Sequence, residues 1–168
     1  EVIEVSRNTI DVRNGWFDTN GMTSFYLAAV RAGYDPKTIL AKLREMVKTR
    51  CQPNGFMSRN PHGIENCSIV PNTINEMLCM GHRGVLRLFP VWPRDMDARF
   101  GQIRAVGAFL VSAELKGGVV GPVKILSEQG RNCTVANPWP GRRVVLSRDG
   151  RQAETIEGER FTFKTARG

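Results

Sequence analysis

A single carboxylate stands out in "NPHGIENCSIVPNTINEML", residues 60–78, where a polar loop runs into the start of a helix. Glu65 lies in that loop, with His62 and Asn66 beside it. A positioned carboxylate can act as a general base, and imidazole or amide groups can bind substrate or tune the carboxylate. The three residues are therefore a candidate site: Glu65 as the catalytic group, His62 and Asn66 as substrate-binding groups. The alternative is that Glu65 is an ordinary solvated loop charge.

Two aromatic residues form a second candidate, in "NGWFDTNG" at residues 14–21. Trp16 and Phe17 offer flat apolar faces beside polar side chains, an arrangement that could stack against a sugar ring. Aromatic side chains also anchor cores and interfaces. Trp16 is the candidate substrate contact, and a role in the core stays open.

Cysteine and histidine could bind zinc, because thiolate and imidazole are the ligands that zinc prefers. Cys79 and His82 have a C-x-x-H spacing, and Cys67 is near in sequence. The chain has no paired-knuckle spacing, however, and Cys79 falls in the apolar last turn of a predicted helix, where buried free cysteine is common. We expect no metal site and no cofactor.

The composition is that of a globular protein of 168 residues with a net charge of +8 and a pI of about 9.9. Lysines and arginines are scattered, and no run of five like charges occurs, so we expect a solvated basic surface and no nucleic-acid partner. The apolar stretches are far shorter than a bilayer-spanning helix needs, so no membrane association is expected. No charged-then-apolar leader opens the sequence, which leaves the compartment undecided.

The first 83 residues predict helical hairpins. One helix spans residues 23–32 and stops at Gly33. The next has Asp35 as its N-cap and Pro36 at its first position, and a third surrounds residues 72–80. Their apolar faces are one-sided, so these helices cannot enclose a core alone and are expected to belong to a larger helical layer.

From Gly84 onward the apolar period changes to two. In "AFLVSAELKGG", Phe109, Val111, Ala113 and Leu115 face one way and the polar residues the other. Turns follow at Gly117-Gly118 and Asp149-Gly150, and strands recur about every 10 residues. Residues 84–168 therefore predict an antiparallel β-sandwich, and the fold class is α+β.

Four segments occur in a fairly specific order: "INEML", "GVLRLFPVWP", "GAFLVSAELKGG" and "VKILSEQGRNCTVANPW". Together they resemble the C-terminal end of glycoside hydrolase family 95, the α-L-fucosidases, and related six-hairpin glycosidases. The likeness covers about Gly21 to Trp139. It implies that residues 1–83 are the last helices of an (α/α)6 catalytic barrel and residues 84–168 a C-terminal β-sandwich. It also implies a glycan substrate, a preceding part of the parent chain as partner, and a periplasmic or secreted protein.

The same resemblance gives Glu65 a role. Family members carry an aspartate, similar to a catalytic base, in a stretch that reads like "F-Q-I-D-G-N-F-G". Counting back without a gap from Glu76 places Glu65 at that aspartate, with Asn66 and Cys67 as further departures from the pattern. An inverting mechanism needs a second carboxyl group as acid, and neither Glu76 nor Asp18 is convincing, so the acid is expected upstream of this chain. The alternative function is a non-catalytic carbohydrate-binding or scaffolding module, in which Glu65 performs no chemistry.

Overall fold

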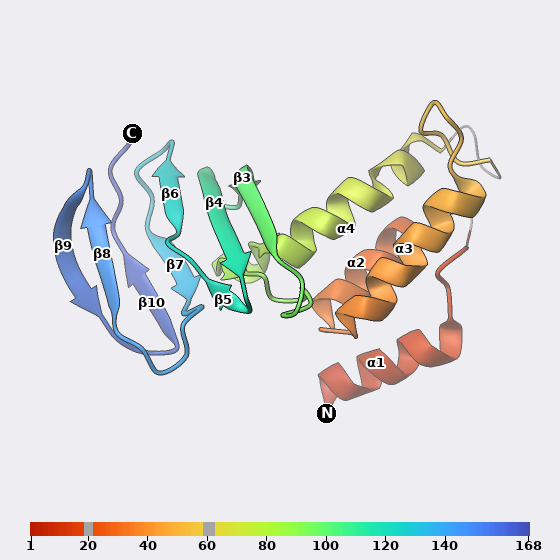
Figure 1. Ribbon diagram of the computed structural model, residues 1–168, viewed down its shortest axis with the longest axis horizontal. Helices are drawn as coiled ribbons and strands as arrows, with labels where there is room; N and C mark the ends of the chain where they lie inside the picture. Colours follow the sequence, from red (N-terminus) through yellow and green to blue (C-terminus); the bar gives the residue numbers. More distant parts are fainter. Residues whose placement is uncertain (19–21, 59–62) are drawn as a thin grey trace. The chain divides into compact units, whose positions relative to one another are not determined.

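The protein combines helices and antiparallel strands in that order along the chain (Figure 1). The computed structural model describes residues 1–18, 22–58 and 63–168. The helices are α1 (Val2–Arg13), α2 (Met22–Arg31), α3 (Pro36–Arg50) and α4 (Ile69–Leu78), with the 3₁₀ turns η1 (Ile64–Ser68) and η2 (His82–Gly84). This confirms the prediction of a mixed α+β protein with antiparallel sheets.

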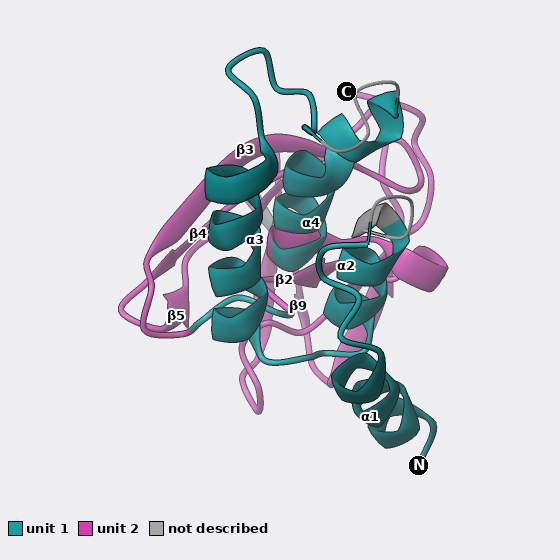
Figure 2. Ribbon diagram, turned by 90° about the vertical axis from the view of Figure 1, so that its right-hand side faces the viewer, with its two compact units in different colours: residues 1–77, 91–93 teal, residues 78–90, 94–168 magenta. Residues whose placement is uncertain are grey.

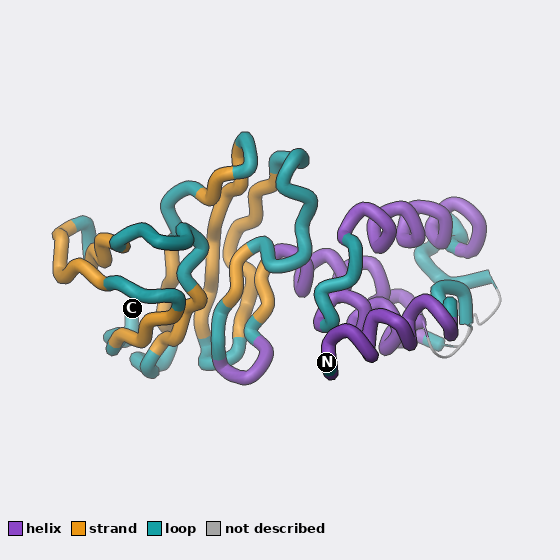
Figure 3. Tube along the Cα trace, turned by 90° about the horizontal axis from the view of Figure 1, so that it is seen from below, coloured by secondary structure: helices purple, strands orange, loops and turns teal. Residues whose placement is uncertain are grey.

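The chain divides into two compact units (Figure 2). The helical unit comprises residues 1–77 and 91–93, and the strand unit comprises residues 78–90 and 94–168. The predicted limits were 1–83 and 84–168. The structure instead assigns residues 78–83 to the strand unit and residues 91–93 to the helical unit. Apart from the short turn η2, the strand unit contains only strands and loops (Figure 3).

Local chemistry determines where α3 begins. The Asp35 carboxylate accepts a hydrogen bond of 2.7 Å from the Thr38 backbone N–H, and Pro36 occupies the first helical position. This satisfies one of the N–H groups that a helix start leaves without a partner. On the buried side of the helix lie Ile39, Leu40, Leu43 and Met46. The predicted cap and apolar face are both present.

Helix α1 lies against the end of α2 through polar contacts. Arg7 Nε donates to the Ala32 carbonyl at 2.9 Å, and the Tyr34 hydroxyl donates to Asp11 Oδ1 at 2.5 Å. Only Ile10 of α1 is buried. None of the helices in the described part of the chain has the length and apolar character that a membrane crossing requires.

The end of α4 corrects the sequence-based prediction. Cys79 and Met80 were expected in the last helical turn, but they form strand β1 (Cys79–Met80), which pairs with β2 (Arg87–Leu88). The Phe89 N–H also bonds to the Leu78 carbonyl at 2.7 Å. Backbone pairing to a segment about eight residues away thus replaces the last turn of the helix.

The remaining strands form small antiparallel sheets. Strand β4 is central to the largest one: β3 lies on one side of it, and β5 and β6 lie on the other. β7 pairs with β10, and β8 pairs with β9. The bounds are β3 (Ala98–Ala105), β4 (Phe109–Lys116), β5 (Val119–Val120), β6 (Lys124–Ser127), β7 (Cys133–Ala136), β8 (Val144–Arg148), β9 (Arg151–Ile156) and β10 (Arg160–Phe163).

The apolar alternation of β4 is as expected, because its four apolar residues from Phe109 to Leu115 are all buried. Both predicted turns occur. Gly117 and Gly118 have φ of 55° and 77° between β4 and β5, and Asp149 and Gly150 have φ of 50° and 79° between β8 and β9. Two consecutive positive φ angles are typical of a type I′ turn, whose twist matches that of the flanking strands.

Candidate functional site

The short turn η1 positions Glu65. The Asn66 N–H bonds to the Gly63 carbonyl at 2.9 Å, and Ser68 Oγ donates to the Glu65 carbonyl at 2.6 Å. The Ile69 N–H then bonds to the Asn66 carbonyl, which links η1 to α4. These bonds hold the loop backbone immediately before the helix, so Glu65 projects from a defined turn.

Adjacent residues of η1 face opposite ways. The Glu65 side chain is exposed, and so is the neighbouring Ile64, at 75%. Asn66 is fully buried. Glu65 can therefore reach solvent or a ligand, whereas Asn66 faces the interior of the helical unit. Direct contact between Asn66 and a substrate stays a prediction. The inward orientation of the side chain does not favour it.

Buried polar atoms near these helices lack partners within the described residues. They are both amide atoms of Asn66, the hydroxyls of Tyr26 and Thr73, and Arg50 Nη1. Burial, with a smaller contribution from Glu45, raises the pKa of the Tyr26 hydroxyl far above its usual value. A buried polar group without a partner costs stability unless water or another group satisfies it. The sequence offers no signal for this set beyond polar residues on apolar helix faces.

Trp16 lies in an aromatic cluster. Its ring is 3% exposed and makes edge contacts with Phe25 at 4.9 Å and Tyr26 at 5.1 Å between centroids. Tyr34 lies at 5.7 Å. The Trp16 ring is therefore enclosed by core neighbours, and a sugar contact through Trp16 stays a prediction.

Phe17 is also engaged. Lys42 Nζ lies 5.4 Å and the Arg50 guanidinium carbon 5.5 Å from its ring centroid, both within cation–π range. His62, the remaining candidate, lies outside the described residues. Of the four predicted site residues, only Glu65 is seen to present its side chain to the surface.

The other carboxylates considered from sequence do not complete a catalytic pair. Glu76 on α4 forms a two-point ion pair with Arg31: Nη2 to Oε1 is 2.9 Å and Nε to Oε2 is 3.4 Å. That contact raises the pKa of the Arg31 guanidinium. Both Glu76 carboxylate oxygens are thus engaged by the Arg31 side chain. Asp18 is exposed and lies at a groove between α1 and α2.

No group of three or more His, Cys, Asp or Glu side chains in the described part of the chain is arranged to hold a metal ion. All four cysteines are free thiols. Cys79 is in β1 and His82 is exposed in η2.

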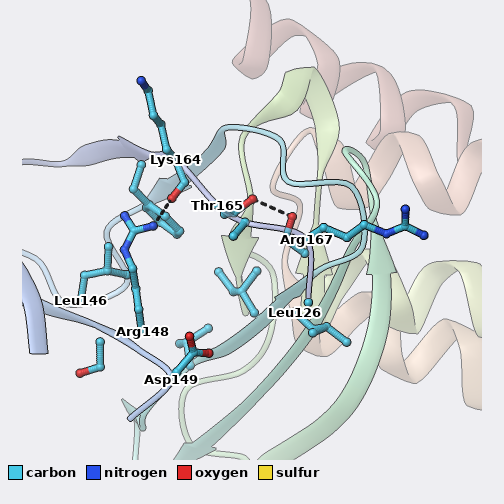
Figure 4. A pocket seen from close by; sticks show the side chains of 14 residues that line it. Leu126, Leu146, Arg148, Asp149, Lys164, Thr165 and Arg167 are labelled. Atoms are coloured by element: carbon cyan, nitrogen blue, oxygen red, sulfur yellow. Dashed lines mark hydrogen bonds between the residues drawn. The ribbon is translucent and has the colours of Figure 1, made fainter. Parts of the chain in front are cut away.

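Hollows also occur elsewhere in the described part of the chain. The groove between α1 and α2 encloses about 680 Å³ and is mostly apolar, with lining residues that include Ile3, Val5, Ile10, Phe25 and Ala28. The strand unit contains a cavity of about 270 Å³ between β6, β8 and residues 163–168 (Figure 4). Apolar side chains such as Ile125, Leu146 and Phe163 line this cavity, and Arg148 and Asp149 lie at its edge.

No protein-family model matches this sequence, and a search of curated proteins found no significant match.

Proposed function

We propose that this chain is the C-terminal part of a carbohydrate-active enzyme resembling the α-L-fucosidase-type six-hairpin glycosidases. In this proposal the helical unit is the end of an (α/α)6 barrel and the strand unit is the C-terminal β-sandwich. The enzyme hydrolyses glycosidic bonds by an inverting mechanism, and it does so only when the rest of the barrel is present.

The observation that carries this proposal is the placement of Glu65. The Glu65 side chain is exposed on a hydrogen-bonded turn directly before α4. Its match to the family's base rests on the ungapped count back from Glu76 in the sequence. The adjacent exposed Ile64 adds apolar surface beside the carboxylate. This is a suitable setting for a base, because a neighbouring barrel wall could exclude bulk water from it while leaving room for the attacking water.

The helical unit also has unpartnered apolar surface. Val2 and Val12 of α1 are 80% and 86% exposed, and Ile3 and Val5, each 58% exposed, line the apolar groove. Apolar patches of this kind usually mark a contact surface. Further helices of a barrel would cover α1, which agrees with the one-sided apolar pattern of the sequence.

The mechanism assigns one step to this chain. Glu65, ionised, would accept a proton from a water that attacks the anomeric carbon, while an acid across the cleft protonates the leaving oxygen. The two carboxyl groups of an inverting enzyme lie roughly 6.5–9.5 Å apart. Because Glu76 is paired with Arg31, the acid is assigned to the part of the enzyme that precedes residue 1.

One observation favours the second candidate, a non-catalytic carbohydrate-binding or scaffolding module. Asn66 and Trp16 are both buried, so neither side chain is presented to a ligand at the surface. In that case Glu65 is a loop charge and the strand unit provides the function.

Activity assays on the parent enzyme and on the 168-residue chain separate the two candidates. The parent should release aryl alcohol from aryl glycosides, and the chain alone should release none above the uncatalysed rate, because it lacks the acid. Robust turnover by the chain alone would overturn the assignment of the acid. A parent that binds glycans without cleaving them would support the module.

A further inference from the structure

The positive charge of this protein is concentrated in one unit. The strand unit contains 15 Lys and Arg against 8 Asp and Glu, whereas the helical unit contains 9 against 8. The scattered pattern along the sequence conceals this asymmetry. A unit with a large excess of one charge attracts ligands of the opposite charge.

Within the strand unit, the β7–β10 pair has one face without acidic residues. The register opposes Arg160 to Ala136 and Thr162 to Thr134, so these four side chains share a face. The opposite face carries Cys133, Val135 and Phe161, all buried. We call the set Thr134, Ala136, Arg160, Thr162 and Lys164 the β7–β10 open face.

Lys164 follows β10 and continues its alternation. Phe163 and Lys164 are both among the residues that line the cavity of the strand unit, and Figure 4 shows the Lys164 side chain extending away from that cavity. Arg160, Thr162 and Lys164 are all exposed. Four residues of extended strand separate the two cations by about 13 Å.

The open face has further polar support. The hydroxyls of Thr134 and Thr162 are hydrogen-bonded to each other at 2.8 Å between the two cations. Arg148 Nη1 donates to the Lys164 carbonyl at 2.7 Å, which brings a third cation to the edge of the open face. Arg148 also forms an ion pair with Glu154 at 3.3 Å. The face thus offers hydroxyl groups flanked by positive charge.

The outward face of the β3–β4 pair is different. There Arg99 lies opposite Glu114, and Arg104 is ion-paired with Glu128. Lys116 follows Glu114 on the same face, and the Asp97 carboxylate accepts from the Gly117 N–H near it. Cations on that face alternate with carboxylates, so it should attract anions less.

We propose that the β7–β10 open face binds an acidic polysaccharide, one bearing carboxylate or sulfate groups. That the ligand is a polysaccharide rests on the proposed carbohydrate function. That this polysaccharide is acidic rests on the positive charge of the open face. Arginine and lysine would hold the anionic groups, and the two threonines would meet sugar hydroxyls. A single-stranded nucleic acid fits less well, because the β7–β10 open face contains no aromatic ring to stack on bases.

The test compares the 168-residue chain binding to dextran sulfate and to neutral dextran of the same length. We expect binding to dextran sulfate alone, and weaker binding as salt is raised from about 50 to about 300 mM, because added ions screen exposed charges. Equal binding to neutral dextran, or no binding to dextran sulfate at low salt, would overturn the proposal.

Two double variants locate the binding. Arg160→Gln/Lys164→Gln removes two charges from the open face, and Arg99→Gln/Lys116→Gln removes the same two residue types from the β3–β4 face. We expect the first variant to raise the Kd for dextran sulfate about tenfold and the second to raise it by less than about twofold. Both variants lose the same net charge, so a difference between them reports the contacts that the open face makes with the polymer. Equal losses would show attraction by net charge alone and refute the site. Should the first double variant fail to fold, the single Arg160→Gln and Lys164→Gln variants replace it.

Polyuridylate of matched charge is the competing probe. Tighter binding of polyuridylate than of dextran sulfate would assign the face to nucleic acid and overturn the proposal. The binding assay needs no turnover, so it fails or succeeds independently of Glu65. If the parent enzyme hydrolyses glycans but the chain does not bind dextran sulfate, only the proposal for the β7–β10 open face is wrong.

Discussion

Replacing Trp16 should measure how much the aromatic cluster stabilises the helical unit. The side chain is almost fully buried and makes edge contacts with Phe25 and Tyr26. Removing a buried tryptophan typically costs about 3–5 kcal/mol, and each aromatic pair accounts for about 0.5–1.5 kcal/mol of such an effect. Trp16→Ala should therefore lower the free energy of unfolding by about 3–5 kcal/mol. The melting temperature should fall by at least about 12 °C in a unit of this size.

Urea denaturation followed by circular dichroism at a helical wavelength is the suitable assay. Trp16→Phe keeps a ring against Phe25 and should lose less, about 1–2 kcal/mol. Val12→Ala is the matched control: that side chain is 86% exposed, so its change should stay within about 0.5 kcal/mol. If Trp16→Ala matched the Val12→Ala control, Trp16 would not be a core anchor, and its role as a sugar contact would regain support.

Two further predictions concern titratable groups. Hydrogen bonds from Thr38 lower the pKa of Asp35 in the folded protein. The stabilisation of α3 by this cap is therefore fully present above the unfolded-state pKa of about 3.9. It is lost as the pH falls through the lower folded-state pKa. Asp35→Ala should cost about 1 kcal/mol at pH 6 and much less at pH 2, measured by urea denaturation; a pH-independent loss would contradict this. Burial and the nearby Cys79 raise the pKa of the Cys133 thiol to about 12, so Cys133 should resist a thiol reagent at pH 8 while the partly exposed Cys51 is modified. Mass spectrometry of the labelled peptides checks this order, and faster labelling of Cys133 would refute it.

Local signals account for the elements that were predicted well. The cap at Asp35, the proline at the first position and the apolar spacing of α3 all act within one helix. The turn at Asp149-Gly150 likewise depends on two residues that tolerate positive φ. No distant part of the chain is needed for either.

Non-local pairing accounts for the failures. Cys79 leaves α4 because its backbone pairs with Leu88, and the helical pattern contains no sign of that partner. Strand β3 was not identified because its alternation is interrupted: the register shifts between Phe100 and Ile103, and Gln102 has a φ of 56°. Such a bulge breaks the period of two on which strand prediction depends.

The loop-to-helix junction that carries Glu65 was predictable, but the orientation of the neighbouring side chains was not. The loop-to-helix junction at Glu65 follows from Pro71 and the apolar run that begins α4. Whether Asn66 or Trp16 faces solvent depends on how the helices pack, and polar or aromatic character alone does not decide it. Both residues face inward, and their roles as substrate contacts stay predictions.

The most direct test of the account is the effect of Glu65→Gln on kcat/KM in the parent enzyme, with Asp18→Asn as a control that also removes one exposed carboxylate. Glutamine keeps the size and polarity of Glu65 but cannot accept the proton. We expect Glu65→Gln to lower kcat/KM about 10²–10⁴-fold with unchanged folding, Glu65→Asp to keep partial or full activity, and Asp18→Asn to cause no comparable loss. Unchanged turnover in Glu65→Gln would show that Glu65 is only a loop charge, and the proposed role as general base would be wrong.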